Sequence, residues 1–160
     1  MSEEGKRLML RHAVATVAYR GGKTLREAPQ GFAGFRAAAG SRTPGEILAH
    51  IGDLFEWALS LARGAHEWHD SAPRPWEQEV ARFYSSLKAF DDTLASPQPL
   101  GFPAERLFQG PVADALNHFG QIAMLRRLAG SPVRGENYLA AEIASGRVGP
   151  EQAAPRREFD

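Results

Sequence analysis

The sequence contains no cysteine, and this absence narrows the chemistry open to the protein. Without cysteine the chain forms no disulfide, offers no thiolate nucleophile of its own and builds no cysteine-ligated zinc site. A metal ion bound to this chain therefore needs histidine, aspartate or glutamate ligands.

An excess of charge of one sign and long apolar runs are also lacking. Nineteen basic residues balance nineteen acidic ones, so no general electrostatic attraction to nucleic acid or to an anionic membrane is expected. No apolar stretch approaches the roughly 20 residues that span a bilayer. The charged residues 1–7 also lack the apolar run of a signal peptide. We therefore expect a cytoplasmic protein with no nucleic-acid partner and no membrane partner.

Several motifs of known enzyme classes are missing as well. The sequence has no P-loop, no dinucleotide-binding fingerprint and no serine nucleophile elbow. A metal-activated water or a metal-bound thiolate is the chemistry that remains open to it.

What is present is the composition of an ordinary globular domain. The 160 residues are 43% hydrophobic and 24% charged, which is typical of one folded domain with a real core. We expect a single domain over 1–160, with its core at about 6–130 and a C-terminal extension at 131–160.

Apolar residues recur at three- and four-residue steps, and no alternating strand pattern appears. The spacing predicts an all-α fold, a four-helix bundle with connections long enough for crossovers. A short turn is expected at 104–108. A short extra C-terminal helix, at about 138–143, precedes a polar tail that lies on the surface or on a partner. The long helices are predicted at 10–28, 43–64, 76–94 and 111–128.

Two local features qualify these helices. Thr43, Pro44 and Glu46 form a capping box with proline at the first helical position, which marks a clear helix start. Gly21 and Gly22 interrupt the first helix. We favour one continuous helix in which another backbone packs closely against the glycines, and a break between two shorter helices is the alternative.

One cluster of residues has the chemistry of a metal site. Asp114 and His118 are four residues apart, so on a helix their side chains share one face. His50 on the second helix is the best third ligand. Two histidines and one aspartate would leave positions open on the metal, as in catalytic sites. Two of the three residues also have a simpler explanation: His50 as a histidine bonded to a carboxylate of its own helix, and Asp114 as a carboxylate favoured by the helix dipole.

The side chains around this cluster suggest supporting roles. Glu46, Asp53 and Trp57 lie on the same helix as His50, and Gln121 follows His118 on the same stripe. We expect Glu46, Asp53 or Gln121 to orient the ligands or to shuttle protons, and Trp57 to line a pocket over the metal.

Two segments resemble the DinB-like family of small helical-bundle metalloenzymes. They are Arg42-Thr-Pro-Gly-Glu-Ile-Leu-Ala-His50 and the last long helix, with His118-Phe-Gly-Gln121. The likeness runs from the first helix to about Tyr138. It implies that His50, Asp114 and His118 bind a divalent metal, most often zinc or nickel. Many members have a histidine where this chain has Asp114, and some relatives have a carboxylate there.

The resemblance also implies a thiol-dependent transferase or a hydrolase, a small-molecule or thiol co-substrate and a homodimer. No catalytic residue beyond the ligands is assigned from the sequence. The alternative is a non-catalytic helical bundle that binds a small molecule or a partner. In that case, the same three residues form a structural polar network.

Overall fold

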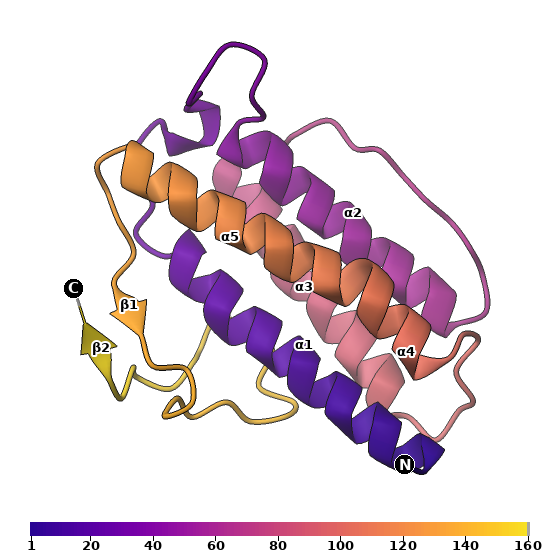
Figure 1. The fold of residues 1–160 in the computed structure, drawn as a ribbon. Coiled ribbons are helices and arrows are strands. Elements are labelled where there is room, and N and C mark those ends of the chain that lie inside the picture. The colour runs from indigo at the N-terminus through magenta and orange to yellow at the C-terminus, as the bar shows by residue number, and fades with distance from the viewer. Residues whose placement is uncertain (160) are drawn as a thin grey trace.

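The computed structural model describes residues 1–159, and four long helices dominate it (Figure 1). The predicted all-α fold is confirmed at this level. Among the described residues the long helices are α1 (Glu3–Leu25), α2 (Pro44–Ala62), α3 (Trp76–Ala95) and α5 (Ala113–Leu128). The short elements are the 3-10 turn η1 (Phe32–Gly34), α4 (Ala104–Leu107), the π turn η2 (Phe108–Val112), β1 (Gly135–Glu136) and β2 (Glu158–Phe159).

The order of the helices in space explains one long connection. Both α1 and α2 pack against α3 and α5. Figure 1 shows that α2 and α3 run in the same direction, as do α1 and α5. Two parallel neighbours cannot be joined by a tight turn, because the chain must return to the end where the first helix began. The segment 63–75 therefore runs back along α2 before α3 starts.

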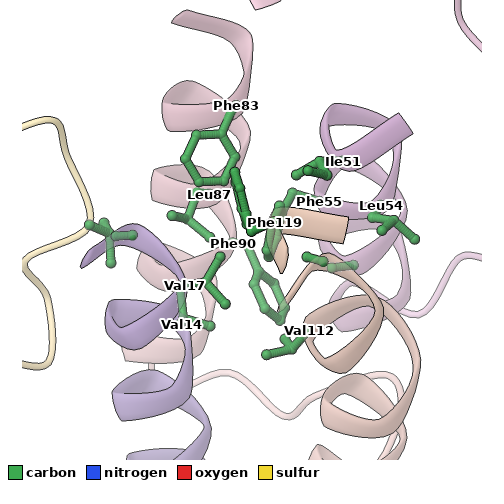
Figure 2. Packing of buried hydrophobic residues seen from close by; sticks show 14 of the residues in the cluster. Val14, Val17, Ile51, Leu54, Phe55, Phe83, Leu87, Phe90, Val112 and Phe119 are labelled. Atoms are coloured by element: carbon green, nitrogen blue, oxygen red, sulfur yellow. The ribbon is translucent and has the colours of Figure 1, made fainter. Parts of the chain in front are cut away.

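The core lies between the four helices and is rich in phenylalanine (Figure 2). Phe55 of α2 contacts Phe83 and Phe90 of α3, with ring centroids 5.9 and 6.3 Å apart. Phe119 of α5 completes the cluster, 5.1 Å from Phe83. Each such buried side chain contributes roughly 1.5–3 kcal/mol through the hydrophobic effect. None of the helices within residues 1–159 has both the length and the apolar character needed to cross a bilayer.

The first helix is continuous through its two glycines, as predicted. It begins at Glu3, where the Ser2 hydroxyl accepts a hydrogen bond from the backbone of the first turn, and it ends at Leu25. A Cβ at Gly21 would lie 2.6 Å from the Phe119 ring, and one at Gly22 would lie 2.5 Å from the Tyr84 hydroxyl. The groups that leave no room for a Cβ at these two positions are therefore large side chains of α5 and α3, and not the neighbouring backbone that was expected.

The start of α2 also follows the prediction. The backbone N–H of Glu46 donates to the Thr43 hydroxyl at 3.2 Å, and the Thr43 N–H donates to the Glu46 carboxylate at 2.7 Å. Both halves of the capping box are formed, with Pro44 in the first turn.

The last long helix differs from the prediction at its start. Instead of a turn followed by a helix from Pro111, α4, η2 and α5 form one unbroken helical run from Ala104 to Leu128. Proline has no N–H to donate and its ring crowds the preceding turn of an α-helix. The wider π turn η2 accommodates Pro111, and regular α-helix resumes at Ala113.

The predicted C-terminal helix at 138–143 is wrong, because this segment forms turns. The Asn137 side chain accepts a hydrogen bond from the Leu139 N–H at 3.1 Å, a local bond that competes with helix formation. The Arg20 guanidinium of α1 lies over the Tyr138 ring, with its carbon 4.3 Å from the ring centroid. Contacts with α1 thus override a weak helical pattern.

The C-terminal extension is held on the bundle by buried charge. Lys23 of α1 pairs with Glu136 and Glu158, both at 2.7 Å, and the Tyr19 hydroxyl donates to Glu136 at 2.6 Å. Glu136 and Glu158 belong to β1 and β2, which pair in antiparallel fashion with Gly135 opposite Phe159. The tail that was expected on the surface is tied to the side of α1.

A second buried network joins α2, α3 and their connection. The Arg82 guanidinium of α3 donates to Asp53 and to Glu56 of α2, and to Glu79 of its own helix. It also donates to the Ser71 hydroxyl at 3.3 Å. Asp53 and Glu79 have 1% or less of their side chains exposed. Their negative charges therefore depend on Arg82 for compensation.

Replacing Arg82 by methionine is expected to lower the free energy of unfolding by about 3 kcal/mol or more, because two buried carboxylates lose their cation. Urea denaturation followed by circular dichroism measures this change. The matched control is Lys88→Met on the same helix, where the exposed ion pair with Asp92 contributes at most about 1 kcal/mol. Equal losses in the two variants would contradict this account.

Candidate metal centre

The structure brings His50, Asp114 and His118 together where α2 crosses α5. His50 Nε2 lies 3.6 Å from Asp114 Oδ2, and His118 Nε2 lies 3.5 Å from Asp114 Oδ1. One ligand atom from each residue lies within 4.8 Å of the other two. The contact arises because α2 and α5 run in opposite directions, so the middle of α2 faces the first turns of α5.

These separations fit a bound metal ion. Ligands about 2.0–2.2 Å from a tetrahedral zinc lie roughly 3.3–3.6 Å from one another. The two histidine–aspartate distances, 3.6 Å to Asp114 Oδ2 and 3.5 Å to Asp114 Oδ1, are in this range. The donor set of two imidazoles and one carboxylate suits zinc and nickel.

His118 is oriented for ligation by Gln121. The Gln121 side-chain oxygen lies 2.7 Å from His118 Nδ1, and because this oxygen can only accept, Nδ1 carries the proton. The lone pair is then on Nε2, the nitrogen that faces Asp114. A hydrogen bond to the far nitrogen of a ligating histidine is a common device for fixing ring and tautomer.

The environment of His50 favours its neutral form. Burial lowers the pKa of His50 below its ordinary value of 6.5, and the nearby His118 and Arg42 lower it further. Asp114 acts in the opposite direction but does not reverse the shift. A neutral imidazole is the form that binds a metal.

Asp114 is the most solvent-exposed of the three clustered residues. Its side chain is 44% exposed, against 19% for His50 and 12% for His118. The helix-dipole explanation does not account for Asp114, because the helical run begins ten residues earlier, at Ala104, and the dipole effect is confined to the first turn. A metal held here would have both room and free coordination positions on the Asp114 side.

Aromatic side chains form one wall beside the cluster. Trp68, from the segment 63–75, lies with its ring centroid 5.6 Å from His50 and 5.8 Å from Trp57. Trp57 therefore reaches the cluster through Trp68 rather than directly. Its indole N–H is buried and has no hydrogen-bond partner within residues 1–159.

Glu46 and Asp53 do not contact the three clustered side chains by any hydrogen bond within the described part of the chain. Glu46 caps α2 and pairs with Arg36 at 3.4 Å. Asp53 accepts from Arg82 and, at 2.9 Å, from the Ser71 backbone N–H. Both line a pocket of about 200 Å³ that also includes His50. Their bonds hold the surroundings of the cluster in place.

Two loop segments complete this pocket, and the sequence reasoning assigned no role to them. Arg42 precedes α2, and Asp70 with Ser71 belongs to the segment 63–75. Arg42 lies within the motif that carries the family resemblance. The position of Asp70 follows from the return of the connection along α2. The sequence predicts connections long enough for crossovers but does not indicate which of their residues reach His50.

Comparison of the sequence with protein-family models gave no match, and none was found among curated proteins or solved structures.

In the metal-free protein, His50 is expected to titrate below pH 6.5, because burial and the neighbouring positive charges disfavour its protonated form. The unfolded chain then binds more protons as the pH falls, so this residue's contribution to stability is lost from about pH 6.5 downward. NMR titration of the imidazole signals measures the pKa. The His50→Gln variant identifies the signal, and a value at or above 6.5 would contradict the assignment.

Proposed function

We propose that this protein is a divalent-metal-dependent enzyme of the DinB-like kind. His50, Asp114 and His118 are its metal ligands, with zinc or nickel as the metal. The observation that carries the proposal is that one donor atom from each of the three residues lies within 4.8 Å of the other two, with histidine–aspartate separations of 3.5 and 3.6 Å. The neutral His50 and the Gln121–His118 hydrogen bond support the same assignment.

The reaction class follows from what the chain supplies and what it lacks. When bound, a divalent metal with open positions supplies Lewis acidity, which lowers the pKa of a water or a thiol near it. The chain has no cysteine, so a thiol would come from a co-substrate. His50 and His118 hold the centre, Gln121 orients His118, and the exposed side at Asp114 admits the co-substrate. We therefore propose a thiol-dependent transferase or a hydrolase.

A second function is favoured by one observation. Asp114 is close enough to both histidines to form ion pairs with them when they are protonated. The three residues then make a structural polar network in a non-catalytic helical bundle that binds a small molecule. This alternative requires no metal.

Metal content separates the two functions. Protein purified without an affinity tag is expected to contain about one zinc or nickel ion per chain, measured by elemental analysis. Losing a ligand removes both a bond and a preorganised position, so His50→Ala and His118→Ala are each expected to weaken zinc binding by a hundredfold or more, on the order of 3 kcal/mol. Isothermal titration calorimetry measures this loss.

His12→Ala is the matched control, because His12 is an exposed histidine of α1 outside the cluster. It should leave metal binding unchanged. A wild-type protein that takes up no metal after soaking with zinc or nickel would overturn the enzyme proposal and favour the polar network.

We also propose that the protein is a homodimer. Apolar side chains are exposed on the adjacent helices α1 and α5, where water would otherwise cover them. They include Met9, with 60% of its surface exposed, Met124 with 54% and Leu128 with 58%.

Light scattering coupled to size exclusion is expected to give twice the 17.5 kDa mass of one chain. Met124→Glu should shift the mass toward that of the monomer, because a buried carboxylate without a partner opposes association. Glu77→Gln, a change at an exposed site on α3, serves as the control. A wild-type monomer would contradict the dimer.

A further inference from the structure

The pocket beside His50 contains two charged side chains that no oppositely charged group of the described chain pairs with. Arg42 and Asp70 are both exposed, and neither forms a hydrogen bond or an ion pair through its side chain within residues 1–159. They line the same pocket of about 200 Å³ without pairing with each other. Opposite charges held apart in one pocket are suited to a ligand that carries both signs.

The other carboxylates of the pocket do not cancel Arg42. Glu46 accepts from the Thr43 N–H and pairs with Arg36. Asp53 is bonded through one oxygen to Arg82 and through the other to the Ser71 N–H. Their acceptor positions are used by the fold, whereas the guanidinium of Arg42 keeps its donors free.

Asp70 is held in place by its neighbour in the chain. The Ser71 N–H donates to Asp53 at 2.9 Å, and the Ser71 hydroxyl accepts from Arg82 at 3.3 Å. These two bonds attach the connection to α2 and α3, both of which are rigid helices. Pro73, two residues further on, also lines the pocket and restricts the backbone. The backbone next to Asp70 is therefore held against α2 and α3.

We propose that this pocket binds a small zwitterion, a molecule with a carboxylate and an ammonium group, beside the metal centre. Arg42 binds the carboxylate through charge-assisted hydrogen bonds, for which a guanidinium is well shaped, and Asp70 accepts from the ammonium group. A volume of 200 Å³ equals about seven water molecules at roughly 30 Å³ each, which is room for a small amino acid.

This assignment rests on the proposed function in one respect. His50 is shared by the pocket and the metal cluster. A zwitterion bound between Arg42 and Asp70 therefore lies beside His50, one of the three proposed ligands, on a side of the centre that Asp114 does not line. The pocket itself is defined by charges that are present whether or not a metal is bound.

Three matched probes test the pocket: 4-aminobutyrate, butyrate and butylamine. Calorimetry with zinc-loaded protein is expected to show that 4-aminobutyrate binds at least tenfold more tightly than either singly charged compound. Arg42→Ala and Asp70→Asn should each weaken 4-aminobutyrate about tenfold, the loss of one charge-assisted contact. Butyrate should respond to the Arg42 change alone, and butylamine to the Asp70 change alone.

Arg74→Ala is the control, because Arg74 is an exposed arginine of the same connection that does not line the pocket. Thermal unfolding of each variant checks the fold, and zinc is quantified in every sample. If the protein binds no zinc but still prefers 4-aminobutyrate, the metal-centre proposal is overturned and the pocket proposal stands. Bound zinc with no 4-aminobutyrate binding, with equal affinity for the three probes, or with an unaffected Arg42→Ala variant overturns the zwitterion pocket.

Discussion

The buried guanidinium of Arg82 is the contact on which the arrangement around the site depends. It joins α3 to α2 through Asp53 and Glu56, and it reaches the returning connection through Ser71. The parallel course of α2 and α3 requires that connection to run along α2. Because buried carboxylates need a cation, one ion network fixes both the helix pair and the loop beside His50.

The metal cluster depends on a second constraint, the register of α5. The π turn η2 adds one residue to the helical run, and one residue corresponds to about 100° of rotation in an α-helix. Asp114 and His118 follow this turn directly, so the π turn determines which way they face. Proline at position 111 gives the wider turn a physical reason. The π turn that accommodates Pro111 thereby also turns Asp114 and His118 toward α2.

Charges near His50 divide into two groups with different roles. Glu46 and Asp53 have their oxygens occupied by backbone N–H groups and arginines, and they stabilise the start of α2 and its connection. Arg42 and Asp70 line the same pocket and are not used in this way. The hydrogen-bonded carboxylates of Glu46 and Asp53 make the pocket rigid. The charged groups of Arg42 and Asp70 remain available to a ligand, which can bind with little reorganisation of the protein.

The sequence by itself determined what is local. Helical periodicity gave the long helices, Thr43 and Glu46 marked the start of α2, and the four-residue spacing put Asp114 and His118 on one face. The tertiary structure alone decided how distant segments meet. It brought His50 to α5, carried the segment 63–75 back along α2, and replaced the expected helix at 138–143 by turns against α1. Spacing along a helix is fixed by backbone geometry, whereas contacts across helices depend on packing and buried charge that no single segment contains.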